Sequence, residues 1–131
     1  MELAQEVQML LQSAQDDISV IFERLGDICR EEHGRTFIAV THPEVMLRTV
    51  QYLQDENNVD MGVKALGARF IGNLSVDNDE TRIALLSVGT IPVLTELLKA
   101  NLSHPLIVRN VTGAFGNLCC NNGKNVDVSM I

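Results

Sequence analysis

Two glycines have a spacing that nucleotide chemistry could use. Gly67 and Gly72 are five residues apart, as are the glycines of a phosphate-binding loop. Asn73 and Leu74 stand where that loop needs Lys and Ser or Thr, and the sequence predicts no strand before it. The spacing therefore does not indicate a phosphate site.

Metal binding and acid-base catalysis are equally poorly supported. Cys29 and His33 are four residues apart and could face one metal from a helix, but two ligands do not complete a tetrahedral site. The adjacent carboxylates at 16–17, 31–32 and 79–80 fall at expected helix ends, where caps and solvated faces are the simpler interpretation. No Ser, Cys and His have the spacing of a nucleophilic triad. We expect no catalytic residue, no metal site, no cofactor and no enzymatic activity.

Two asparagines give the most informative spacing. Asn73 and Asn117 are 44 residues apart, and each lies between a Gly and a Leu. Apolar residues around them recur at the same interval, for example Val63 with Ile107. Upstream, three apolar positions at 47, 50 and 53 match three at 91, 94 and 97. A period of this length over two helices predicts stacked helical repeats.

A weaker third copy precedes these two. Gly26-Asp27-Ile28 lies 46 residues before the first Gly-Asn-Leu, as a two-residue difference in one loop would produce. Asp27 replaces the Asn in this copy. The repeat pattern therefore begins before residue 30.

These residues resemble the armadillo-repeat family, whose units have a short first helix, a second helix and a long third helix with a small-Asn-Leu signature. The likeness is clearest over 55–125, in the segments VGTIPVLTELL and GAFGNLCCNNGKN. The resemblance implies an all-α fold, a right-handed α-solenoid of about two and a half armadillo-type units from a longer array. It also implies one domain over 1–131, divided into a partial unit and later units over 1–34, 35–78, 79–122 and 123–131.

Helical periodicity and capping residues predict the elements of these units. Gly34 is placed to end the helix that begins near Ile18, and Thr41-His42-Pro43-Glu44 reads as a capping box for the next helix. Gly67 and Gly72 are expected where backbones pack closely. The expected helices cover about 2–15, 18–34, 42–54, 61–76, 81–87, 91–100 and 105–120.

Net charge, cysteine content and hydropathy indicate which kinds of partner and which cell compartment to expect. The formal charge of −7 opposes binding to nucleic acid, which needs clustered Lys and Arg, and favours a basic partner. Three cysteines make a poor disulfide framework, which indicates a reducing compartment, the cytoplasm with the nucleus as alternative. No apolar run of about 18 residues or basic N-terminal start predicts a membrane span or export.

The resemblance also implies a candidate site. In such proteins the third helices line a concave groove, and the signature Asn hydrogen-bonds the main chain of an extended partner. Carried over to this sequence, that role falls to Asn73 and Asn117, because a carboxamide both donates and accepts. The alternative is that each Asn bonds a neighbouring repeat. By helical spacing, Asp27 and three further charged residues share this face: Glu23, Arg69 and Arg109.

Three functions remain open. The first is a protein-interaction scaffold that binds a partner segment or surface in this groove. The importin mode is disfavoured, because Glu23, Arg69 and Gly113 stand where importins place Trp. The second is regulation of small GTPases, since GNLCCNN is similar to the GDP-dissociation-stimulator family. The third is a structural module that self-associates through an exposed apolar end.

Overall fold

The structure is a computed structural model that describes residues 18–76 and 78–119 of the 131-residue chain. This part of the chain forms seven helices and no strand, which confirms the expected all-α class there. The helices are α2 (Ile18–Ile28), α3 (Glu32–Thr41), α4 (Glu44–Gln54), α5 (Met61–Leu74), α6 (Asp79–Ser87), α7 (Thr90–Ala100) and α8 (Pro105–Leu118). The helix expected over 2–15 and the unit start expected over 123–131 lie outside the described residues.

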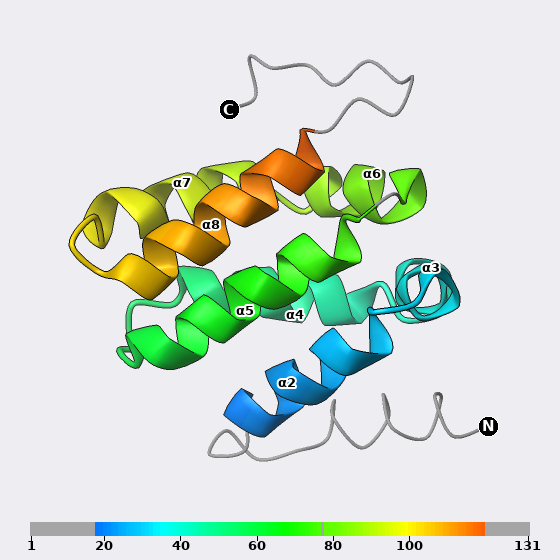
Figure 1. The fold of residues 1–131 in the computed structure, drawn as a ribbon, viewed down its shortest axis with the longest axis horizontal. Helices are drawn as coiled ribbons and strands as arrows, with labels where there is room; N and C mark the ends of the chain where they lie inside the picture. The colour runs from blue at the N-terminus through cyan, green and yellow to red at the C-terminus, as the bar shows by residue number, and fades with distance from the viewer. Residues whose placement is uncertain (1–17, 77, 120–131) are drawn as a thin grey trace.

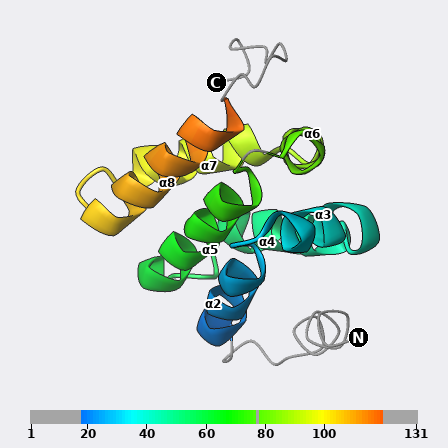
Figure 2. The ribbon, with the colours of Figure 1, turned by 45° about the vertical axis from the view of Figure 1, so that its right-hand side comes forward.

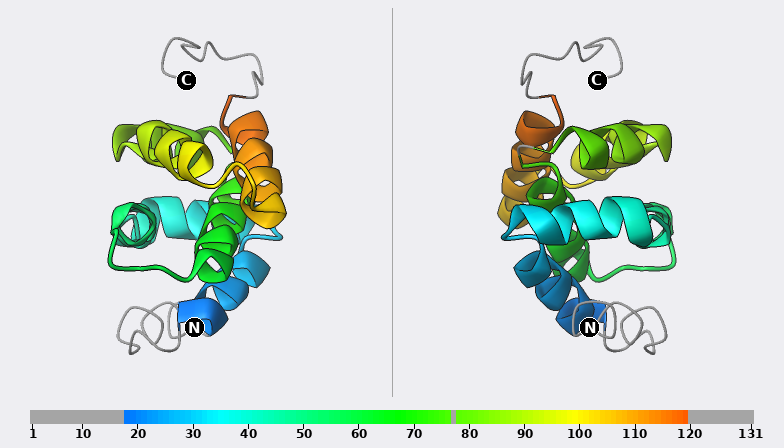
Figure 3. Two further views of the ribbon diagram at one scale, coloured as in Figure 1. Left: turned by 90° about the vertical axis from the view of Figure 1, so that its left-hand side faces the viewer. Right: turned by 90° about the vertical axis from the view of Figure 1, so that its right-hand side faces the viewer.

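The helices are arranged in two layers. Helices α2, α5 and α8 lie side by side in chain order and form one layer (Figure 1). The other layer places α3 against α6 and α4 against α7, as Figure 2 and Figure 3 show. Each element of the α3–α5 triplet therefore contacts its counterpart in the α6–α8 triplet.

Several helices have an N-cap residue whose side chain accepts a hydrogen bond from a backbone N–H of the first turn. Asp60 accepts from Val63 N before α5, and Asn78 accepts from Thr81 N at 3.0 Å before α6. Before α8, His104 Nδ1 accepts from the N–H of Ile107 at 3.3 Å. These starts agree within two residues with the helices expected at 61, 81 and 105.

The junction between α6 and α7 needs a glycine. Gly89 has a φ of 83°, which is in the left-handed region that side chains with a Cβ rarely adopt. It follows the last turn of α6 and precedes Thr90, the first residue of α7. Gly89 therefore ends α6 in a conformation that a residue with a Cβ would adopt only with strain.

Two expected helix boundaries are wrong. Helix α2 ends at Ile28, and Gly34 lies in the first turn of α3, a helix that the sequence did not predict. A Cβ on Gly34 would stand 1.9 Å from the Ile28 carbonyl oxygen, so this glycine permits a close approach and does not end a helix. Thr41 is the last residue of α3, and Pro43 occupies the N-cap position of α4 without a side-chain bond.

The core fills the space between the layers, and small residues let the helices approach. Phe70, Ile71 and Leu74 of α5 are fully buried. A Cβ on Gly67 would lie 3.1 Å from Leu53 Cδ2, and one on Gly72 would lie 3.5 Å from the Ala114 Cα. Both glycines are therefore packing sites, as expected. Further buried core residues are Ile38, Leu85, Ile91, Leu94, Ile107, Val111 and Leu118.

One core position in α4 differs from the expected repeat. Leu47 is 42% exposed, although its counterpart Ile91 is 2% exposed. Met46 is buried in its place, together with Val50 and Leu53. The buried stripe of α4 thus begins at Val45, two residues before the position that the 44-residue offset predicts.

A membrane-spanning helix was not found among the described residues: none is both long and apolar enough alone. Helices α6 and α7 pass a test of length and composition only as a pair, with a bend of 74° between them. Leu85 of α6 and Leu94 of α7 are fully buried in the core.

Candidate protein-interaction surface

The six expected groove residues all lie on the layer of α2, α5 and α8. Two come from each helix: Glu23 and Asp27 from α2, Arg69 and Asn73 from α5, and Arg109 and Asn117 from α8. The four charged residues are exposed, and the two asparagines are half-buried. These six residues define the third-helix face, the exposed side of this layer.

Asn117 makes a contact within the protein. Its Nδ2 donates to the backbone carbonyl of Gly72 at 2.9 Å, across the interface between α8 and α5. Asn110, two turns earlier on α8, donates in the same way to the carbonyl of Ala65 at 2.9 Å. Each donor lies 45 residues after its acceptor, so the pair fixes the register of α8 along α5. Sequence reasoning missed Asn110, although its spacing of seven residues from Asn117 places both on one helical face.

Asn73 has a related position on the preceding pair of helices. Its Nδ2 lies 3.5 Å from the point where a Cβ of Gly26 would stand, so it packs against the bare backbone of α2. Gly26 and Gly72 are the residues that precede Asp27 and Asn73 in their copies of the signature. In both interfaces, therefore, an Asn of one long helix lies beside a glycine of the helix before it. This arrangement corresponds to the alternative in which the Asn contacts a neighbouring repeat.

The charges of the third-helix face are divided between its helices. Glu23 and Asp27 make the α2 part acidic, whereas Arg69 and Arg109 make the α5 and α8 part basic. Asp27 pairs with Arg30 at 3.6 Å, but both side chains are about 70% exposed, so solvent weakens this attraction. An exposed Arg can hold a carboxylate with two parallel hydrogen bonds. The face thus offers a partner both signs of charge in a fixed order.

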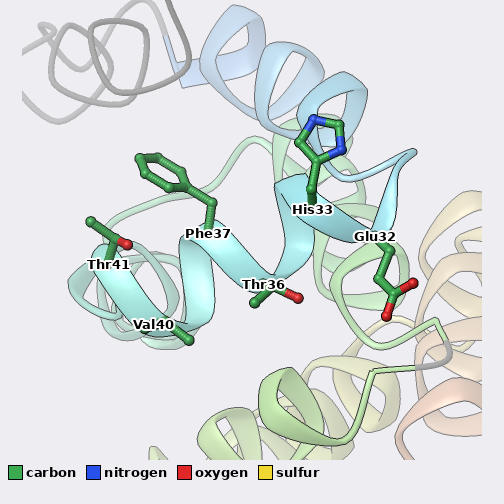
Figure 4. Close-up of a pocket in the computed structure, with 6 residues that line it drawn as sticks. All are labelled: Glu32, His33, Thr36, Phe37, Val40 and Thr41. Atoms are coloured by element: carbon green, nitrogen blue, oxygen red, sulfur yellow. The ribbon is translucent and has the colours of Figure 1, made fainter. Parts of the chain in front are cut away.

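Helix α3 carries a second, shallow surface. Figure 4 shows the side chains around it, which come from successive turns of α3: Glu32, His33, Thr36, Phe37, Val40 and Thr41. Thr36 Oγ1 accepts from Asn78 Nδ2 at 3.0 Å, which links α3 to the start of α6. Val40 is 64% exposed, so this surface is partly apolar. It offers contact area, and no catalytic arrangement is present among these six residues.

The cysteine and histidine that could have shared a metal lie in different environments, one buried and one exposed. Cys29 is 1% exposed, and burial raises the pKa of its thiol to about 12. His33 is exposed and lies 3.2 Å from Glu31 through its Nδ1. Across residues 18–76 and 78–119, no group of three or more His, Cys, Asp or Glu could hold a metal ion.

Fold and surface together define an all-helical protein in which one helix triplet is repeated alongside another. The chain is 28% identical over 121 residues to Rap1 GTPase-GDP dissociation stimulator 1-A of Xenopus laevis, and the match covers 86% of this chain. This distant homology to an armadillo-repeat protein confirms the resemblance drawn from the sequence. The chain spans about a fifth, 19%, of that relative's length. No family model matches the chain, and no solved structure matches it.

Proposed function

We propose that the chain is part of a right-handed α-solenoid of armadillo-type units and acts as a protein-interaction scaffold of the cytoplasm or nucleus, without catalysis. The side-by-side layer of α2, α5 and α8 supports the solenoid, because the same kind of interface is used twice in succession. In this proposal α3–α5 and α6–α8 are complete units. Their third helices present the binding surface.

The observation that carries the proposal is the set of four exposed charges on three adjacent helices. Arg69 and Arg109 project from neighbouring helices and provide donors for carboxylates of a partner. The amide nitrogen of Asn117 is already engaged by the Gly72 carbonyl, so Asn117 has less to offer a partner than the arginines have. We therefore assign most of the partner contact to the charged residues and a smaller part to Asn73 and Asn117.

A photo-crosslinking experiment tests the scaffold. A benzoylphenylalanine replaces Arg69 or Arg109 in one set of variants and Arg48, an exposed residue of α4, in the control. We expect one partner to be crosslinked in cells from positions 69 and 109 and not from position 48. Equal crosslinking from all three positions, or none from 69 and 109, would contradict the proposed surface.

A second candidate function is regulation of a small GTPase, which the distant relative favours because its name describes GDP dissociation from Rap1. Purified Rap1 loaded with a fluorescent GDP analogue provides the probe. We expect the protein to bind Rap1 and to accelerate nucleotide release, and Arg69→Glu with Arg109→Glu to weaken binding by about tenfold or more. Arg48→Glu serves as the matched control.

The outcomes of the Rap1 experiment separate the two functions. Binding that Arg69→Glu with Arg109→Glu reduces, and that Arg48→Glu leaves unchanged, supports a GTPase partner on the third-helix face. Absence of binding to Rap1 removes this GTPase as partner, and the crosslinking result then decides the scaffold. Circular dichroism of each variant checks that the helices are retained.

A further inference from the structure

A second concave site lies away from the third-helix face. A cleft of about 520 Å³ is enclosed by the end of α4, the loop over 55–60, the start of α5 and one side of α7. These elements meet at the left edge of the view in Figure 1. The floor of the cleft is apolar: Leu53 and Leu97 are buried there, and Met61 and Val93 are half-buried beside them.

The polar groups around the cleft include several hydrogen-bond acceptors. Asn58 Nδ2 donates to the backbone carbonyl of Tyr52 at 3.2 Å, and Asn101 Nδ2 donates to that of Leu97 at 2.9 Å. Each of these amides thus uses one N–H within the protein and keeps its carbonyl oxygen, an acceptor, together with a second N–H. Glu56 and Glu96 add two exposed carboxylates to the lining, one on the loop and one on α7.

Lys64 is the cationic residue of this lining, and it is already engaged. Its side chain is buried, and Nζ donates to the Asp55 carbonyl at 3.0 Å. Burial lowers the pKa of this amine, and the charges of Asp55 and Glu56 oppose that shift. Lys99 lies outside the lining and pairs with Glu96 at 3.7 Å, but both side chains are more than two-thirds exposed and the pair is weak.

We propose that this cleft binds an arginine side chain of a partner protein segment. The aliphatic stem of arginine matches the apolar floor at Met61 and Leu97, and the guanidinium reaches the carboxylates of Glu56 and Glu96. Arginine fits better than lysine because its planar group carries five N–H donors and can bind more than one acceptor of the lining at once. The cleft is formed by the end of α4, the 55–60 loop, the start of α5 and α7, and it shares no lining residue with the six residues of the third-helix face.

A peptide titration followed by amide chemical shifts tests the proposal. The probe is N-acetyl-Ala-Arg-Ala-amide, and the matched control replaces arginine with citrulline, which has the same shape without the charge. We expect shift changes confined to residues of the cleft and a Kd for the arginine peptide about fivefold lower than that for the citrulline peptide, with the difference shrinking at high salt. Equal binding of the two peptides, or changes centred elsewhere, would overturn the proposal.

Variants distinguish the wall carboxylates from general attraction to an acidic protein. Glu56→Gln with Glu96→Gln should weaken binding of the arginine peptide about fivefold. Glu23→Gln with Asp27→Asn removes the same charge from the third-helix face and should leave binding unchanged. If both double variants weaken binding equally, the attraction is nonspecific and the assigned site is wrong.

The sign of the occupant's charge has its own test. Lys64→Met removes the cation of the lining and keeps an unbranched apolar stem, so it should leave the affinity for the arginine peptide unchanged or raise it. A cleft built for anions through Lys64 would instead bind N-acetyl-Ala-Glu-Ala-amide and lose that binding in Lys64→Met. That result would refute the proposal, and the amide spectrum of the variant shows whether the fold is retained.

Discussion

The α2–α3 junction and the α5–α6 junction are equivalent, since each joins a long helix to the next short helix, but the start of the following helix contacts the end of the preceding helix differently in each. The first junction joins α2 to α3 with three residues between the helices, and the second joins α5 to α6 with four. At the first, the backbone of Gly34 lies against the Ile28 carbonyl so closely that a Cβ would be 1.9 Å away. At the second, Thr81 occupies the corresponding place, and its hydroxyl donates to the Leu74 carbonyl. The shorter junction has no room for a side chain at this position. The longer junction places a threonine there, which forms a hydrogen bond to the long helix.

Each junction also contains a buried arginine that holds the end of the long helix. Arg35 Nη1 donates to the Cys29 carbonyl at 2.9 Å, and Arg82 Nη1 donates to the Ser75 carbonyl at 3.1 Å. Arg82 has an acidic partner as well, because its Nη2 pairs with Asp79. Arg35 has a buried Nε with no hydrogen-bond partner. The second junction is therefore the better satisfied of the two.

The largest effect that would sharpen this comparison is expected at the glycine of the first junction. Gly34→Ala places a methyl group against a backbone oxygen that cannot move independently of α2, so we expect the free energy of unfolding to fall by about 3 kcal/mol or more. Urea unfolding followed by circular dichroism measures the change. A cost below about 1 kcal/mol would show that the junction is not constrained as described.

A second glycine provides the control for Gly34→Ala. A Cβ on Gly113 in α8 would meet no atom within 4 Å. Gly113→Ala should therefore raise the free energy of unfolding by about 0.5–1 kcal/mol, because alanine loses less backbone entropy in a helix. Opposite signs for the two substitutions would establish that close approach, and not glycine as such, is required at position 34.

Substitutions of the two arginines test whether the junction with more of its hydrogen-bonding groups paired contributes more to the free energy of unfolding. Arg82→Met leaves the Ser75 carbonyl and Asp79 without their donor and should cost about 2–3 kcal/mol, below the range for a fully buried ion pair because Asp79 is partly exposed. Arg35→Met loses one hydrogen bond but also removes an unsatisfied N–H, and should cost about 1 kcal/mol. Chemical denaturation of both variants gives the comparison, and equal costs would contradict it.

Alkaline pH should weaken the first junction through its cysteine. Burial raises the pKa of Cys29 from 9.0 to about 12, although the charge of Arg35 acts in the opposite direction. The thiol of Cys29 has a higher pKa in the folded state than in the unfolded state, so deprotonation favours unfolding. The free energy of unfolding is therefore unaffected below pH 9 and falls as the pH rises toward 12, by about 1.4 kcal/mol at pH 10. Cys29→Ala lacks this titration. Its stability should therefore fall less between pH 8 and pH 10 than that of the unchanged protein, and equal slopes would argue against the assigned cause.

At the second junction, the smaller loss of stability is expected at Thr81. Thr81→Val keeps the shape of the side chain but removes the hydroxyl that donates to the Leu74 carbonyl. We expect the free energy of unfolding to fall by about 1 kcal/mol, as measured by urea titration. A cost as large as that of Gly34→Ala would mean that both junctions depend equally on this contact, which would remove the contrast between them.

The long helices and the packing glycines could be predicted because their signals are local or periodic. Asn73 and Asn117 recur with their flanking residues, and Gly67 and Gly72 interrupt otherwise apolar helices where only close packing compensates. Helix α3 was missed because Gly34 reads locally as a helix end. Its actual role depends on the position of the Ile28 carbonyl, which no local pattern encodes.

The candidate site was predictable in placement but not in its contacts. Helical spacing assigned Glu23, Arg69 and Arg109 to one face, and in the structure all three are exposed on helices of one layer. Asn110 and Asn117 donate to backbone carbonyls. Every residue has such a carbonyl, so the sequence does not indicate which ones accept these bonds. The phase of α4 was also missed, because Met46 and Leu47 are both apolar and only packing against the other helices selects one of them.

The hydrogen bonds of Asn110 and Asn117 have a consequence for how the protein tolerates mutation. Because every residue supplies a main-chain carbonyl, a substitution at Ala65 or Gly72 removes bulk or adds it but never deletes the acceptor. The asparagines have no such redundancy. A saturation library should therefore show different constraints on the two sides of the α5 and α8 interface. On α5, at Ala65 and Gly72, only the size of the side chain should be limited, whereas on α8, at Asn110 and Asn117, the amide group itself should be required.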